Sequence, residues 1–133
     1  PDMAPMLFAE AASTGKGIEV YNYGKQQRDF TFISDVVEGI FLLAVRPDIP
    51  DAATVCNIGN GSPVGLMDFI SLIETSLDCE IEKKLVKAQK GDVVSTFADT
   101  SKLQSLVNYE PKVGLEQGIP IFMEWFKSYF NVK

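Results

Sequence analysis

The sequence predicts a fold of the α/β class, in the form of a small α+β lobe with several helices and short strands. Apolar residues recur at helical spacing over long stretches, whereas the segments that alternate like strands are short and scattered. The chain has 133 residues, of which 46% are apolar, and this suits one domain with one modest core. These observations favour a small lobe over a complete doubly wound sheet.

The first half of the chain predicts two helices and two intervening strands. The first helix begins near Met3, accommodates Pro5 in its first turn and ends close to Gly15. Ser34 or Asp35 can cap the second helix. In order, we expect a helix over 3–16, a strand over 18–21, a polar loop over 22–27, a strand over 28–33, a helix over 34–46 and a loop over 47–53.

The second half predicts three short strands and three helices. Asp99 or Thr100 can cap the shortest of these helices. Pro120 suits only the first turn of the last helix, so the pattern leaves the beginning of that helix open. In order, we expect a strand over 54–58, a helix over 66–77, a strand over 81–86, a strand over 94–98, a short helix ending near 107 and a helix over 115–130.

Composition excludes several classes of function. The net charge is −6 with no basic cluster, which argues against a nucleic-acid partner. The absence of histidine removes most zinc sites and the Ser-His and Cys-His nucleophile pairs. No apolar run reaches the length of a membrane span. Cys56 and Cys79, without a signal peptide, are typical of reduced thiols, so we expect a cytoplasmic location.

A glycine-containing loop that leads into Arg28 is the strongest candidate for a binding site. The stretch runs from Asn22 through Gly24 and Arg28-Asp29 to Asp35. The planar guanidinium donates two parallel hydrogen bonds to phosphate oxygens, and a strand end holds it in one direction. Considered alone, the pair Arg28-Asp29 fits an ordinary surface ion pair at least as well.

A second polar loop runs from Gln89 through Gly91 to Asp92. Gly91 allows the backbone to approach a ligand, and a carboxylate such as Asp92 can accept hydrogen bonds from two ribose hydroxyls. A plain polar turn explains the same residues. The turn at 59–61 lacks the third glycine of a dinucleotide-binding loop, so we do not expect it to bind a dinucleotide.

The ordered set of these motifs resembles the carboxy-terminal part of a known family. The pieces are Val-Tyr-Asn-Tyr-Gly at 20–24, Arg-Asp-Phe-Thr at 28–31, Asp-Val-Val-Glu-Gly at 35–39, Gly-Asp-Val at 91–93 and Ala-Asp-Thr at 98–100. Together they resemble the extended short-chain dehydrogenase/reductase family of nucleotide-sugar epimerases and dehydratases. Within it, Pro-Asp-Met at the start and the Gln-x-Gly-Asp-Val loop are most similar to the branch that epimerises UDP-glucuronate.

The resemblance implies a role for each matching residue in binding a UDP-sugar. Arg28 would bind the diphosphate, and Gln89 stands where many relatives carry a second phosphate-binding arginine. Asp92 would bind the ribose. The backbone of Glu19 and Tyr21 would meet the uracil.

The resemblance also implies that catalysis requires residues outside this chain. The NAD-binding Rossmann domain and the Tyr-x-x-x-Lys pair of the family would precede residue 1, and we expect Pro1 to follow a cut in a longer chain. Residues 1–133 would then be the nucleotide-sugar-binding domain of a homodimeric, NAD-dependent 4-epimerase, without turnover of its own. A different UDP-sugar epimerase, a dehydratase and a free-standing nucleotide-binding or interaction domain remain open alternatives.

Overall fold

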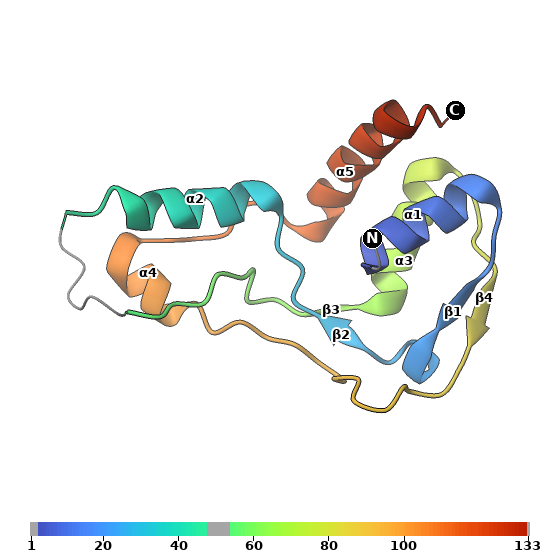
Figure 1. Cartoon of the computed structure of the whole chain (residues 1–133), viewed down its shortest axis with the longest axis horizontal. Coiled ribbons are helices and arrows are strands. Elements are labelled where there is room, and N and C mark those ends of the chain that lie inside the picture. Colours follow the sequence, from blue (N-terminus) through green and yellow to red (C-terminus); the bar gives the residue numbers. More distant parts are fainter. Residues whose placement is uncertain (1–2, 48–53, 133) are drawn as a thin grey trace.

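The computed structural model describes residues 3–47 and 54–132, and it is elongated (Figure 1). One end holds α1 (Ala4–Thr14), α3 (Leu66–Leu77) and α5 (Leu115–Phe130), together with β1 (Ile18–Val20) and β4 (Lys83–Leu85). The other end holds α2 (Ile33–Ala44) and α4 (Ser101–Val107). The 3-10 turn η1 (Tyr21–Gly24), β2 (Gln27–Arg28) and β3 (Val64–Gly65) lie in the chain between the two ends. The mixture of helices and short strands confirms the predicted fold class.

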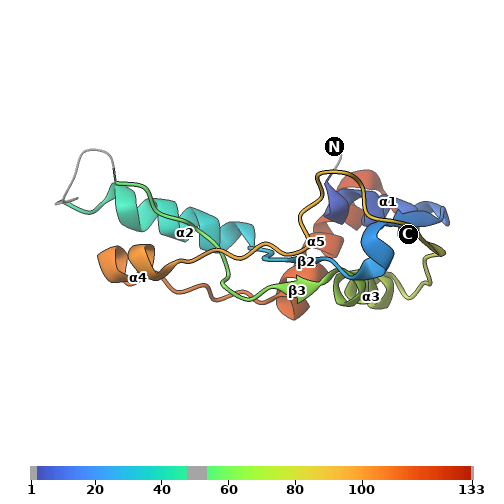
Figure 2. The same cartoon turned by 90° about the horizontal axis from the view of Figure 1, so that it is seen from below.

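The hydrophobic core lies where α1, α3 and α5 meet, and Figure 2 shows these three helices gathered at one end. Phe69 is only 1% exposed and stacks on Phe30 with ring centroids 4.3 Å apart. This contact draws the chain after β2 back against α3. The buried members of the core are Phe8, Ala9, Ala11, Val20, Leu66, Phe69, Ile70, Ile73, Ile81, Ile119, Met123 and Phe126.

The helix termini follow from residues that tolerate unusual backbone angles. Gly15 ends α1 with φ of 67°, and the following N–H of Lys16 donates to Ala11 O over 3.1 Å. Asn108 and Asn131 adopt the same left-handed region after α4 and α5. Pro120 lies inside α5, whose beginning at Leu115 agrees with the prediction.

In the described part of the chain, two small sheets stand where five strands were predicted. β1 pairs with β4 in parallel, and β2 pairs with β3 antiparallel. The strand expected over 28–33 was too long, because the register opposes Arg28 to Val64 and so places Pro63, which lacks an N–H, at the next position. The segment 94–98 forms only a single bridge at Ser95, and 54–58 forms no strand.

The second helix also differs from its prediction. α2 begins at Ile33, so neither Ser34 nor Asp35 occupies the N-cap position. Asp35 is instead 2% exposed in the first turn, where its Oδ2 accepts a hydrogen bond from the N–H of Val113 over 3.0 Å. A carboxylate at this helix end is also stabilised by the helix dipole. The predicted loop over 47–53 lies outside the described residues apart from Pro47.

α2 exposes an apolar face at the end opposite to the core. Ile33, Val37, Ile40, Phe41 and Val45 are each more than half exposed. We call these five residues the α2 face. None of the described helices combines the length and the apolar character needed to cross a membrane.

We predict that Phe69→Ala lowers the free energy of unfolding by about 3–5 kcal/mol, because the cavity lies between packed helices that cannot close on it. Urea unfolding followed by circular dichroism measures the change. Phe97→Ala is the matched control: Phe97 is 66% exposed, so its removal should change stability by less than about 0.5 kcal/mol. Equal losses in the two variants would contradict this account of the core.

Glu74 connects α3 to β4 and makes stability depend on pH. Its carboxylate accepts hydrogen bonds from the N–H of Ile81, over 2.7 Å, and from the ammonium of Lys83. Burial opposes ionisation of Glu74, but the Lys83 ammonium and the Ile81 N–H outweigh it, and the pKa of Glu74 is lowered. A lowered carboxyl pKa adds stability above its unfolded value of about 4.3, and this is lost as the pH falls.

We therefore predict that Glu74→Gln is less stable than the parent chain near neutral pH. The difference should shrink between about pH 5 and pH 3, because protonation of Glu74 removes the same interaction from the parent chain. Thermal unfolding across this pH range measures it. Parallel stability curves would show that Glu74 does not carry this dependence.

Candidate functional site

Two segments far apart in the sequence run side by side across the molecule. They begin as the parallel strands β1 and β4 (Figure 1). Beyond these strands the N–H of Gln27 donates to Val94 O over 2.9 Å, and the N–H of Thr96 donates to Gln27 O over 3.3 Å. We call this paired region, residues 18–29 and 83–98, the seam. All five residues predicted to bind a ligand belong to it.

Arg28 extends from β2 and is half-buried. Its Nη1 donates to Gln27 O over 2.8 Å and to Val94 O over 3.4 Å, so both sides of the seam orient the guanidinium. Among the described residues no carboxylate forms an ion pair with Arg28. The surface Arg28-Asp29 pair considered from the sequence therefore does not form, and the cation keeps donors for an anion.

Asp92 lies next to β2 because Gln26 holds it there. The Nε2 of Gln26 donates to Asp92 Oδ2 over 2.9 Å, across a separation of 66 residues. Gln26 is only 8% exposed, whereas Asp92 is exposed. Sequence reasoning missed Gln26. The available signal was its position two residues before Arg28, which places both side chains on one face of an extended segment.

Gln89 and Asp92 share a tight turn. The N–H of Asp92 donates to Gln89 O over 3.2 Å, and Gly91 adopts φ of 94°, which a residue with a side chain rarely adopts. The side chain of Gln89 is exposed. The turn therefore orients the backbone of Asp92 and leaves Gln89 at the surface beside it.

Glu19 and Tyr21 lie at the other end of the seam. The hydroxyl of Tyr21 donates to Glu19 Oε2 over 3.3 Å, and the ammonium of Lys84 donates to Glu19 Oε1 over 2.9 Å. The hydrogen bond and charge of Lys84 lower the pKa of Glu19. The side chain of Glu19 is therefore already bonded to Tyr21 and Lys84.

The backbone of Glu19 and the N–H of Tyr21 face away from β4. The N–H of Ile18 donates to Glu82 O, and the carbonyl of Val20 accepts from the N–H of Val86. Alternate residues of a strand direct their backbone groups to opposite edges, and the N–H of Tyr21, the first residue of η1, is trans to the Val20 carbonyl across a planar peptide. Among the described residues β4 is the only strand beside β1. The second edge of β1 therefore presents the carbonyl of Glu19, and the N–H of Tyr21 follows it directly.

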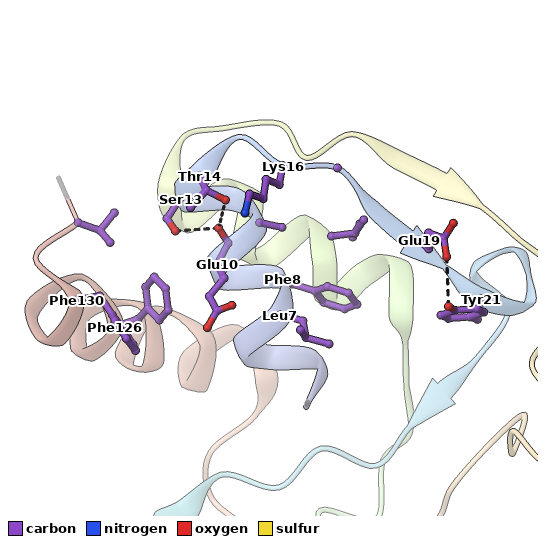
Figure 3. Close-up of a pocket in the computed structure, with 14 residues that line it drawn as sticks. Leu7, Phe8, Glu10, Ser13, Thr14, Lys16, Glu19, Tyr21, Phe126 and Phe130 are labelled. Carbon is purple, nitrogen blue, oxygen red and sulfur yellow. Dashed lines mark hydrogen bonds between the residues drawn. The ribbon is translucent and has the colours of Figure 1, made fainter. Parts of the chain in front are cut away.

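A groove of about 670 Å³ lies between α1, β1 and the end of α5 (Figure 3). Phe8, Phe126 and Phe130 form part of its apolar wall. Glu19 and Tyr21 line its rim, but Arg28, Gln89 and Asp92 do not belong to its lining. The predicted ligand residues thus form an open strip along the seam and not an enclosed cavity. Within the described ranges, 3–47 and 54–132, no cluster of Asp, Glu and Cys side chains is arranged to hold a metal ion.

Comparison with known proteins connects this arrangement to one family. Residues 2–59 match the NAD dependent epimerase/dehydratase family. An uncharacterized protein of Methanocaldococcus jannaschii is 50% identical over 95% of this chain and 38% of its own length. A probable UDP-glucuronate 4-epimerase of Rhizobium meliloti is 35% identical over 98% of this chain and 43% of its own length.

A solved structure agrees in three dimensions. The UDP-glucuronic acid 4-epimerase of Bacillus cereus, in complex with UDP-glucuronic acid and NAD, is 29% identical with a TM-score of 0.89. The match covers 97% of this chain and 41% of that protein. The chain thus spans about two fifths of the length of the relatives that it matches. Residues 2–59 thus match the NAD dependent epimerase/dehydratase family, and nearly the whole chain is similar to the carboxy-terminal part of the epimerases that it resembles.

Proposed function

We propose that this chain is the UDP-binding part of an NAD-dependent nucleotide-sugar 4-epimerase that acts on UDP-glucuronate. The observation that carries the proposal is the order of groups along the seam. A free backbone edge comes first at Glu19 and Tyr21, a carboxylate follows at Asp92, and a guanidinium comes last at Arg28. UDP has the same order of base, ribose and diphosphate.

The edge of β1 suits uracil. The imide side of uracil carries an N–H beside a carbonyl, and the backbone of an unpaired strand offers the complementary acceptor and donor. We assign this contact to the carbonyl of Glu19 and the N–H of Tyr21. Because only backbone atoms are required, the side chain of Glu19 remains free to pair with Lys84.

Asp92 and Arg28 suit the polar remainder of the nucleotide. Gln26 occupies one carboxylate oxygen of Asp92, and the other can accept from the ribose hydroxyls. Arg28 contributes a charge-assisted, bidentate contact to the diphosphate. The exposed Gln89 adds an uncharged donor beside them. Such contacts hold the substrate equally before and during the reaction, so they position the sugar and do not themselves lower the chemical barrier.

NAD belongs, in this proposal, to the remainder of the full-length protein. The turn at 59–61 does not fit the pyrophosphate, because the N–H groups of Asn60 and Gly61 already donate to the carboxylate of Asp29. The chemistry that NAD supplies when bound is to accept a hydride from C4 of the sugar and to return it to the other face. The residues of this chain anchor the nucleotide while the sugar turns.

The α2 face fits a role as the contact with that remainder. Its five residues lie on one side of α2 and are exposed, and the segment 55–58 belongs to no β-ladder within the described residues. The relatives continue for well over half of their length outside the matched region. An additional α/β domain could bury this face and pair with this segment.

We predict that Arg28→Ala in the full-length protein weakens binding of UDP-glucuronate by about 1.5–3 kcal/mol, the usual cost of losing hydrogen bonds to a charged group. Isothermal titration calorimetry measures the dissociation constant. Lys102→Ala removes an exposed cation from α4 and should leave binding unchanged. An unchanged dissociation constant for Arg28→Ala would refute its role.

We also predict that Val37→Lys and Ile40→Lys act differently in the two contexts. In the 133-residue chain, where both residues are exposed, each should change the free energy of unfolding by less than about 0.5 kcal/mol. In the full-length protein each should cost about 1.5–3 kcal/mol, because the apolar side chain is buried there. Denaturant unfolding of both proteins tests this, with Ile121→Lys on α5 as the control. Equal, small effects in both would show that the α2 face stays exposed.

A further inference from the structure

The carboxylate of Asp29 joins three separate parts of the chain. Its Oδ1 accepts from the N–H of Asn60 over 3.2 Å, and its Oδ2 accepts from Gly61 N–H over 3.1 Å and from Ala98 N–H over 2.9 Å. Its own N–H donates to Thr96 Oγ1 over 3.0 Å. Asp29 thus bonds to two segments, 60–61 and 96–98, whose residues lie 31 to 69 positions away in the sequence.

The three parts are also tightly packed where they meet. A Cβ added at Gly59 would lie 2.3 Å from the Cβ of Ala98 and 3.1 Å from Asp29 Oδ2. No residue other than glycine fits this position without moving the backbone. The carboxylate therefore lies in a close junction and not in a flexible surface contact.

This junction is adjacent to both polar parts of the seam. Asp29 directly follows Arg28, and it holds the segment 94–98, which begins two residues after Asp92 and contains the carbonyl that orients Arg28. Residues 92–98 are thus attached to residues 26–29 at both ends. Gln26 holds Asp92 at one end, and Asp29 holds Ala98 at the other.

We propose that Asp29 is a positioning residue, which sets the placement of Arg28 relative to Asp92 and thereby the fit of the site to the diphosphate. This inference rests on the proposed function. Without the carboxylate the segment 94–98 keeps its backbone bonds to Gln27 but loses its attachment at Ala98, so the carbonyl of Val94 is held less firmly beside Arg28. Arg28 then keeps its bond to Gln27 O and loses the second contact that orients it, while Gln26 continues to hold Asp92.

An ionised carboxylate suits this place better than any other side chain. It accepts at both oxygens, and charge-assisted bonds to backbone N–H groups are about twice as strong as neutral ones. Asparagine has nearly the same shape, but its NH₂ group would face the N–H of Asn60 in one orientation and those of Gly61 and Ala98 in the other. Asp29→Asn therefore removes the charge and at least one bond of the junction with little change in volume.

The test is calorimetry of the full-length protein with UDP and with uridine. We expect Asp29→Asn to weaken UDP about tenfold, with uridine changed by less than about twofold, because base and ribose do not depend on Arg28. In the Arg28→Ala background the same substitution should change UDP binding by less than about twofold, since Asp29 acts through Arg28. Glu124→Gln, which removes an exposed carboxylate from α5, should leave both ligands unaffected.

Each other result overturns a defined part of the proposal. Equal weakening of UDP and uridine, or effects of Asp29 and Arg28 that simply add, would mean that Asp29 only maintains the fold. If the parent protein does not bind UDP, the proposed function is wrong, and the positioning role of Asp29 is then wrong as well. If Asp29→Asn does not fold, Thr96→Val serves in its place, because it keeps the carboxylate and removes one bond to the segment. It should weaken UDP about threefold and leave uridine unchanged, and no effect on UDP would refute the proposal.

Discussion

The parallel pairing of residues 18–29 with residues 83–98 in the seam determines how the remaining elements are arranged. Two parallel segments cannot be joined by a tight turn. After the first segment of the seam, the chain therefore needs a long connection that brings the second segment back to the same starting end. Residues 30–82, which contain α2 and α3, form this connection. α3 packs against α1 and α5 in the core. Folding of the core therefore brings the two sides of the seam together.

Polar side chains reinforce the seam because its backbone ladders are short. β1 and β4 share three register pairs, and β2 and β3 share two. The contacts of Gln26 with Asp92, of Asp29 with Ala98 and of Glu19 with Lys84 extend the alignment beyond these ladders. The same contacts orient the groups proposed to bind UDP, so stability and ligand binding share one set of interactions.

The helices could be predicted closely, whereas the strands could not. The bounds of α3 and α5 agree with the predicted ranges, because an apolar repeat of a helix lies within a few consecutive residues. The strands expected over 28–33, 54–58 and 94–98 are shorter or absent as ladders. Whether a segment becomes a strand depends on a partner elsewhere in the chain, and Pro63 ends the ladder between β2 and β3 after two residues.

The fold class, the long helices and the residue types suited to a nucleotide, including Arg28 and Asp92, could be predicted from the amino-acid sequence, because they follow from local periodicity and from the chemistry of single side chains. The contacts between distant segments could not: Arg28 forms no ion pair with Asp29, Gln26 holds Asp92, and Asp29 instead joins segments up to 69 residues away. Hydrogen bonds between residues so distant in the chain leave no local pattern, since their partners meet only when the core has assembled.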